Sequence, residues 1–373
     1  MKTSVILTCG IAALLLTVNA NAYSPIAPGD LVVYRVGDGS AALSSTTSVV
    51  FLDEYTQSGT LVQSIAMPTV SSGGQSALFA QGNSTSEGLL TLSTDGSLLM
   101  LTGYAVTSTN PSIQAASSVN RVVGEVAVNG SGIDTSTVLS DAASASSVRA
   151  AASTDGTSIW ISGGAGAVRY TTKGSTTSTQ LITTPTNLRQ VAIFNGQLMI
   201  SDASGTAVRI GTVGSGLPTT SGQTATALPG TSGSSPTGPY AFTMLRLGAG
   251  PGAPDTMYVS DDGASTLEKW SLSGGTWSMT GSIAVSAPRG VAAVLEGDGV
   301  HVFFTATGGV TNIMEITDSS GLGGSLSGTA TTIAQASPFE AFRGIVVTIP
   351  EPSTMLLVSA GLVGLLAIRR RRS

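Results

Sequence analysis

A strand–turn–strand unit recurs through most of the chain, and this repeat is the feature that most constrains the fold. The first strand of the unit is rich in Val, Ala and Ile, and the second ends in Ser or Thr with Asp or Gly. The turns between them carry Asp95-Gly96, Asp155-Gly156 and Asn195-Gly196. Because these dipeptides tolerate the positive φ of tight hairpin turns, each pair is predicted to be an antiparallel hairpin. The repeat therefore predicts an all-β chain.

The first strands of the unit begin at six places, and four of these are closely similar in sequence. They are spaced by about 62, 40, 51, 49 and 54 residues, which variable loops around a four-stranded blade would give. We therefore predict a β-propeller over residues 23–349 with six blades, or seven if residues 106–140 hide another. A β-helix or a pair of sandwiches is the alternative, and the unequal periods argue against the β-helix. The six starts are at Glu87, Arg149, Arg189, Tyr240, Arg289 and Arg343.

The two ends of this region are predicted to close the ring. The last copy, residues 342–348, has no room for a second strand before the tail. The region opens with residues 30–36, 49–55 and 60–67, which look like later strands that lack a first one. Pairing of the C-terminal strand with these N-terminal strands would remove the open sheet edges that invite aggregation.

The composition excludes several classes of protein. Only 10% of residues are charged and the net charge is −5, so the chain has neither long charged helices nor a basic stripe for nucleic acid. Gly-x-Gly pieces lie in turns without a following helix, and no calcium-loop pattern occurs, so we predict no cofactor and no metal. The one cysteine, Cys9, lies in a segment that we expect to be removed.

The N-terminus is typical of a secretory signal peptide. Met1-Lys2 is followed by an apolar stretch at residues 5–18 and by Ala20-Asn21-Ala22. A basic start, a short apolar region and an A-x-A site predict a signal peptide over residues 1–22 that is cleaved after Ala22. The alternative is an N-terminal membrane anchor, although the apolar run is short for a span.

The C-terminus has three parts in a fixed order. They are Pro350-Glu351-Pro352, an apolar segment at residues 355–368 that is predicted to be a helix, and a basic cluster consisting of Arg369, Arg370, Arg371 and Arg372. The basic cluster would hold its end at the cytoplasmic face. In these features residues 350–373 resemble the PEP-CTERM sorting signal.

That resemblance implies an exported bacterial protein. It implies processing near Pro350 to Pro352 by an exosortase, after a transient stay in the inner membrane through the C-terminal helix. It also implies a final location at the cell surface or in an extracellular matrix that contains exopolysaccharide. The alternative is a plain tail anchor that is not processed.

Two short patterns in the body resemble NHL-like six-bladed propellers. They are Pro288-Arg289-Gly290-Val291 and Tyr258-Val259-Ser260-Asp261. The resemblance implies the fold and no activity.

No convergent catalytic set is found in the sequence. The one histidine, His301, lies in an alternating strand pattern, and no G-x-S-x-G elbow occurs. The carboxylate pairs Asp53-Glu54 and Asp261-Asp262 are adjacent in sequence, so on a strand their side chains point to opposite faces. We therefore predict no catalytic residues and a non-enzymatic binding scaffold. A propeller hydrolase or lyase acting on glycans is the alternative.

The six starts of the repeat supply the predicted ligand-binding residues. Four of the nine arginines between the two terminal segments occupy this one repeat position. Because the innermost strands of a propeller begin at one face of the central channel, these guanidinium groups would converge there, and loops carrying Asp202 and Asp261 would open on the same face. Such a cluster favours an anionic ligand such as an acidic exopolysaccharide. The alternative is that each arginine only locks adjacent blades together. The predicted residues are Glu87, Arg149, Arg189, Tyr240, Arg289 and Arg343.

Overall fold

The computed structural model describes residues 23–106, 112–233, 236–307 and 311–348. The predicted signal peptide with its cleavage site at Ala22 lies outside these residues, and so does the sorting segment from Pro350 onward. Within the described part the chain forms twenty-five β-strands and one short 3-10 helix, η1 (Ile113–Ala115). None of the helical structure in that part is long and apolar enough to cross a membrane. The prediction of an all-β fold is confirmed.

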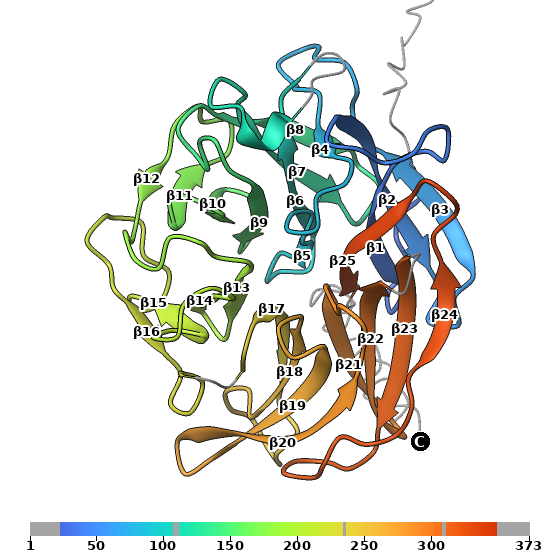
Figure 1. Ribbon diagram of the computed structural model, residues 1–373, viewed down its shortest axis with the longest axis vertical. Helices are drawn as coiled ribbons and strands as arrows, with labels where there is room; N and C mark the ends of the chain where they lie inside the picture. The colour runs from blue at the N-terminus through green and yellow to red at the C-terminus, as the bar shows by residue number, and fades with distance from the viewer. Residues whose placement is uncertain (1–22, 107–111, 234–235, 308–310, 349–373) are drawn as a thin grey trace, which may run out of the picture.

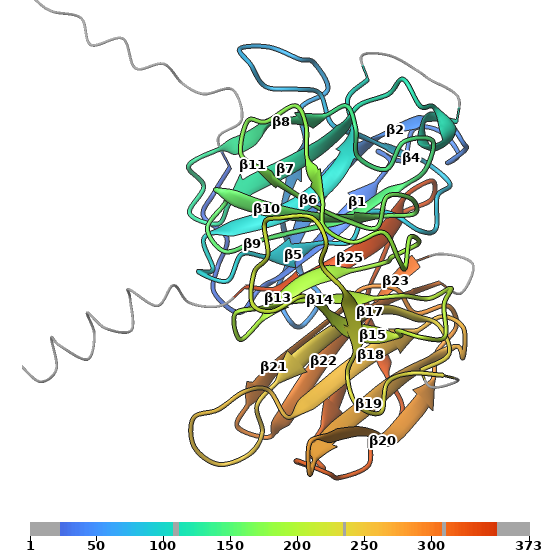
Figure 2. The same ribbon diagram turned by 90° about the vertical axis from the view of Figure 1, so that its left-hand side faces the viewer.

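The strands are arranged as a β-propeller, with sheets that follow one another around a central axis (Figure 1). Seen from the side, the strands cross the thickness of the ring (Figure 2). Four sheets stand separately as antiparallel four-stranded blades. The first two blades are β9 (Val148–Ser153), β10 (Ser158–Gly163), β11 (Val168–Thr172) and β12 (Thr179–Gln180), then β13 (Val191–Phe194), β14 (Gln197–Ser201), β15 (Ile210–Val213) and β16 (Ala225–Ala227). The other two are β17 (Pro239–Leu245), β18 (Thr256–Asp261), β19 (Thr266–Ser273) and β20 (Thr276–Ala284), then β21 (Val291–Glu296), β22 (Gly299–Thr307), β23 (Thr311–Asp318) and β24 (Thr331–Gln335).

The remaining strands form one nine-stranded sheet. It contains two antiparallel series, β25-β1-β2-β3 and β5-β6-β7-β8, joined by the short strand β4. The bounds are β25 (Ala341–Val347), β1 (Leu31–Val36), β2 (Thr47–Tyr55), β3 (Leu61–Ala66), β4 (Phe79–Gln81), β5 (Thr91–Leu92), β6 (Leu98–Tyr104), β7 (Arg121–Ala127) and β8 (Ile133–Leu139).

The predicted count of six separate blades is therefore wrong, because only four blades are separate sheets. The cause is β4, which pairs with β2 through Thr47↔Gln81 and with β6 through Phe79↔Tyr104. Strand β2 is long enough to offer residues 47–49 to β4 beyond its pairing with β3. Residues 106–140 do not form a further blade either, because they supply β7 and β8 of this sheet.

The predicted closure of the ring is confirmed. Strand β25 pairs antiparallel with β1, from Leu31↔Val347 to Val36↔Ala341. The amide of Gly29 also donates to the carbonyl of Thr348 at 2.9 Å. Strands from the two ends of the described chain therefore pair with each other in one sheet.

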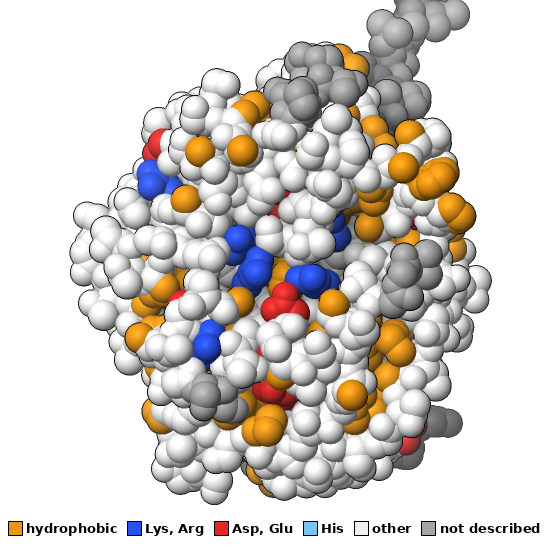
Figure 3. Space-filling model, viewed as in Figure 1, with side chains coloured by type: hydrophobic (Ala, Val, Ile, Leu, Met, Phe, Trp, Pro, Cys, Tyr) orange, Lys and Arg blue, Asp and Glu red, His pale blue; other side chains and the backbone are white. Residues whose placement is uncertain are grey.

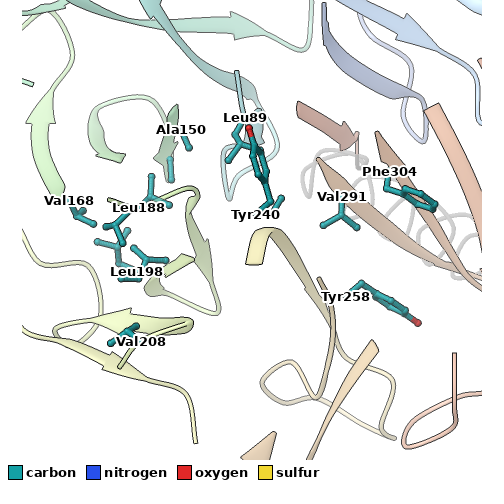
Figure 4. Packing of buried hydrophobic residues seen from close by; sticks show 14 of the residues in the cluster. Leu89, Ala150, Val168, Leu188, Leu198, Val208, Tyr240, Tyr258, Val291 and Phe304 are labelled. Carbon is teal, nitrogen blue, oxygen red and sulfur yellow. The ribbon is translucent and has the colours of Figure 1, made fainter. Parts of the chain in front are cut away.

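The inner strands approach one another closely, which explains their small residues. A Cβ added at Gly344 would lie 2.3 Å from the Leu90 nitrogen, and one at Gly290 would lie 2.8 Å from the Arg343 oxygen. Both distances are shorter than real Cβ contacts, so only glycine fits. The largest core cluster combines residues of successive blades, including Ala150, Leu188 and Val291 (Figure 4). This packing fixes the chain segments that begin the inner strands at one end of the channel.

Candidate functional site

Basic side chains gather at the centre of one face of the ring (Figure 3). The four arginines of the repeat lie in or just before β9, β13, β21 and β25, where these strands begin. Their common neighbour is Tyr240, at the start of β17. We call this cluster the arginine mouth; it comprises Arg149, Arg189, Arg289, Arg343 and Tyr240.

Tyr240 is the centre of the arginine mouth. Its side chain is buried, and its hydroxyl donates to the carbonyl of Thr85 at 2.8 Å. The Cζ atoms of Arg189 and Arg289 lie 5.0 and 4.8 Å from the centroid of its ring, within the range of cation–π attraction. Burial raises the pKa of Tyr240, and the positive charges of all four arginines oppose that rise. The fold therefore brings together residues that share one position of the internal repeat.

Arg343 is neutralised by Glu87. Its Nη1 donates to Glu87 Oε1 at 3.0 Å, and its Nη2 donates to the carbonyls of Gln81 and Gly82. Glu87 also accepts hydrogen bonds from the hydroxyl of Tyr104 and the amide of Gln81, both at 2.7 Å. The side chains of the pair are only 7% and 3% exposed. This pair connects β25 with the segment that leads into β5.

Arg289 is also paired with a carboxylate. Its Nη1 lies 2.7 Å from Asp262 Oδ2, and the two side chains are partly buried. Asp262 follows β18, so this ion pair joins the blade of β17–β20 to the blade of β21–β24. Sequence reasoning gave Asp262 no part in the mouth, because its partner comes from the next repeat.

Arg149 has polar partners but no carboxylate. Its Nε donates to Ser147 Oγ at 2.9 Å, and its Nη1 donates to Asn187 Oδ1 at 2.6 Å and to the carbonyl of Leu188 at 2.9 Å. Burial and, after it, the positive charge of Arg189 lower the pKa of Arg149 to about 10. The two guanidinium groups are thus close enough to repel one another.

Arg189 differs from the other three. Among the described residues, its guanidinium group has neither a carboxylate nor a carbonyl within hydrogen-bond distance. Its Nε is buried without an acceptor, as is the Nε of Arg343. Its recorded side-chain contact is the ring of Tyr240. In the described structure, the four arginines of the mouth are balanced by two carboxylates, Glu87 and Asp262, which leaves a surplus of two positive charges.

Two aspartates that were expected to open on this face are used elsewhere. Asp202 accepts hydrogen bonds from the amides of Ser204 and Gly205. Asp261 accepts from the amides of Gly238 and Ala264. Both carboxylates are buried, so they stabilise turns rather than face a ligand.

The channel changes character below the mouth. A cavity of about 160 Å³ lies among the inner strands. It is lined by uncharged residues of β5, β9, β13, β17, β21 and β25, together with flanking ones such as Gln190. The charge of the channel is therefore concentrated at the end where the arginines lie.

The other candidate groups do not converge on a cavity. His301 lies between Asp298, with Nε2 to Oδ1 at 2.9 Å, and Glu315, with Nδ1 to Oε1 at 3.2 Å. Nearby carboxylates raise the pKa of His301 against the effect of its burial. Asp53 pairs with Arg35, whereas Glu54 accepts from the amide of Ala27, so this adjacent pair diverges as predicted. The described residues contain no group of three or more His, Cys, Asp or Glu side chains suited to a metal ion.

Comparison with known families identifies the C-terminus. The model of the PEP-CTERM protein-sorting motif matches residues 348–372. The chain therefore carries a PEP-CTERM motif, which indicates an exported protein that is processed at the membrane. No curated protein matches the sequence significantly.

Solved structures share the fold at low sequence identity. A chain of the nidogen/laminin complex is 11% identical with a TM-score of 0.50, over 86% of this chain and 98% of that one. The GH74 enzyme of Niastella koreensis is 13% identical with a TM-score of 0.46, over 83% and 46% of the two chains. A glucose dehydrogenase is 9% identical with a TM-score of 0.43, over 79% and 99%. The first likeness concerns the fold alone, and the other two support no conclusion.

Proposed function

We propose that this protein is a non-catalytic surface or matrix scaffold that binds an acidic exopolysaccharide at the arginine mouth. The observation that carries the proposal is the surplus of positive charge there. Two of the four guanidinium groups have no carboxylate partner in the described structure, in a chain whose net charge is −5. A chain this poor in basic residues gains little from gathering four arginines unless an anion compensates them.

The class of ligand follows from the guanidinium group and from the export of the protein. Guanidinium forks bind carboxylate and sulfate groups through paired hydrogen bonds. An exported protein that is sorted to the surface meets such groups mainly on acidic polysaccharides. The central position of the mouth on one face of the ring suits one charged sugar of a polymer that continues across that face.

Affinity electrophoresis tests this proposal. The purified protein is run through gels that contain polygalacturonate, dextran sulfate or neutral dextran. We expect retardation by the two polyanions but not by dextran, and weaker retardation as salt is added, because ionic contacts are screened. Arg246→Gln is the matched control, because Arg246 pairs with Asp255 in the loop between β17 and β18, at the opposite end of β17 from the mouth. Equal mobility in all three gels would refute the proposal.

The purified protein and the polymer that retards it also show whether the protein is a scaffold or a glycan-active enzyme. A scaffold leaves the polymer intact, whereas a hydrolase releases reducing ends and a lyase produces unsaturated ends that absorb ultraviolet light. We expect neither product after prolonged incubation with the retained polymer. Release of either product would replace the scaffold by the enzymatic alternative.

A further inference from the structure

We infer that the acidic ligand is held by Arg149 and Arg189 alone, through a single carboxylate or sulfate group, while Arg289 and Arg343 only position the mouth. This inference rests on the proposed function and assigns it to two of the four arginines. The basis for the inference is a comparison of the four guanidinium groups: some of their N–H donors already have acceptors in the protein, and others do not.

Arg343 is held by the chain at both of its terminal nitrogens. Both Nη1 and Nη2 donate to groups of the chain, namely Glu87 and two carbonyls. Arg289 uses Nη1 on Asp262, so its charge is already balanced. An anion placed on either arginine would have to approach a carboxylate, which repels it.

Arg149 and Arg189 keep free donors without a competing carboxylate. Nη2 of Arg149 has no recorded acceptor, and it is close to Gly164, where an added Cβ would lie 2.9 Å from it. No N–H group of the Arg189 guanidinium has an acceptor among the described residues. The two residues are also linked directly, because Arg149 donates to the carbonyl of Leu188, the residue before Arg189.

Two buried arginines of this protein differ from the half-buried Arg189 in their partners. Arg121 donates to the carbonyls of Gln114, Ala116, Val119 and Ser146. Arg209 donates to those of Ala203 and Gly233. The fold therefore caps these guanidinium groups with backbone carbonyls but leaves Arg189 uncapped. The terminal nitrogens of Arg189 have no acceptor among the described residues and are not buried, so an external acceptor can reach them.

An anion between Arg149 and Arg189 would also remove their mutual repulsion. Burial is the main cause that lowers the pKa of Arg149, and the positive charge of Arg189 lowers it as well. The two guanidinium groups therefore repel each other when no anion is bound. One carboxylate or sulfate offers enough oxygens to accept from both groups at once. Tyr240 holds Arg189 in place through its ring, and its own hydroxyl is already used on Thr85.

Calorimetric titration tests the assignment. The full protein is titrated with trigalacturonate, with a sulfated trisaccharide and with inorganic phosphate at one ionic strength. We expect Arg189→Gln to weaken the binding of trigalacturonate at least tenfold without changing the melting temperature appreciably, because the side chain of Arg189 makes no hydrogen bond to the described residues. Arg149→Gln should weaken binding to a similar degree. Comparing the three ligands shows whether the shared anion chemistry comes from a carboxylate, a sulfate or free phosphate.

A charge-neutral variant separates a specific site from general attraction. The double variant Arg246→Gln/Asp255→Asn removes an ion pair outside the mouth and leaves the net charge unchanged, so we expect less than a threefold change in affinity. Wild-type binding that persists in both Arg149→Gln and Arg189→Gln would overturn the inference and leave the proposed function standing. A wild-type protein that binds none of these ligands and is not retarded by either polyanion would overturn both.

Discussion

Replacing Glu87 by Gln tests whether the pair of Glu87 and Arg343 stabilises the propeller. The substitution keeps the volume of the side chain and removes its charge. Glu87 Oε1 lies 3.0 Å from Arg343 Nη1, and both side chains are almost fully buried. Breaking a buried ion pair by removing one partner costs about 3–5 kcal/mol, because the other charge is left uncompensated. Arg343 keeps its bonds to two carbonyls, so we expect a loss near the lower end, about 3 kcal/mol.

The assay is urea unfolding followed by the fluorescence of Trp160, Trp270 and Trp277. A double-mutant cycle with Arg343→Met isolates the interaction, and we expect a coupling free energy of about 2 kcal/mol or more. Asp38→Asn is the matched control, because it makes the same chemical change on an exposed turn. A coupling below about 0.5 kcal/mol, the size found for exposed pairs, would refute the claim that this pair is a lock.

Three further predictions concern other parts of the chain. Lys269 is fully buried and its Nζ lies 2.7 Å from Asp318 Oδ2, so we expect Lys269→Met to lower the free energy of unfolding by about 3–5 kcal/mol. A loss below about 1 kcal/mol in urea unfolding would contradict this. Burial and the neighbouring Glu54 raise the pKa of Asp30 from 3.8 to about 6, so its contribution to stability is full below 3.8 and is lost as the pH rises through 6. Asp30→Asn should therefore flatten the fall in urea midpoint between about pH 4 and pH 7, and an unchanged slope would exclude this carboxyl as the cause. Intact-mass measurement of the exported protein should place its C-terminus near residues 350–352, whereas a full-length tail would show that the motif is not processed.

The local structure followed closely from the sequence. The second strands of the unit were predicted to end in Ser or Thr with Asp or Gly, and β10 and β18 do end in Ser162-Gly163 and Ser260-Asp261. The three predicted N-terminal strands are β1, β2 and β3 with shifts of at most two residues. Alternating apolar residues and Asp-Gly or Asn-Gly turns carry this information locally, so no distant contact was needed to read it.

The sheet count could not be read in the same way. Strand β4 has only three residues, Phe79–Gln81, and lies in a stretch that carries no strand pattern of its own. It becomes a strand because β2 and β6 offer it unpaired backbone groups from both sides. The first strand that was predicted to start at Glu87 is similarly displaced, because the regular pairing there begins only with β5 (Thr91–Leu92).

The sequence by itself determined that the chain carries a sorting motif, folds as β-hairpins arranged around an axis, and places four arginines at one repeat position. The tertiary structure alone decided what each arginine does. Glu87 and Arg343 are 256 residues apart in sequence, and Asp262 meets Arg289 from a different blade. Whether a guanidinium group finds a carboxylate depends on which loops the closed ring brings to the mouth. This depends on how the sheets assemble and cannot be read from the local sequence. Only the folded protein therefore shows that Arg149 and Arg189 have no carboxylate partner.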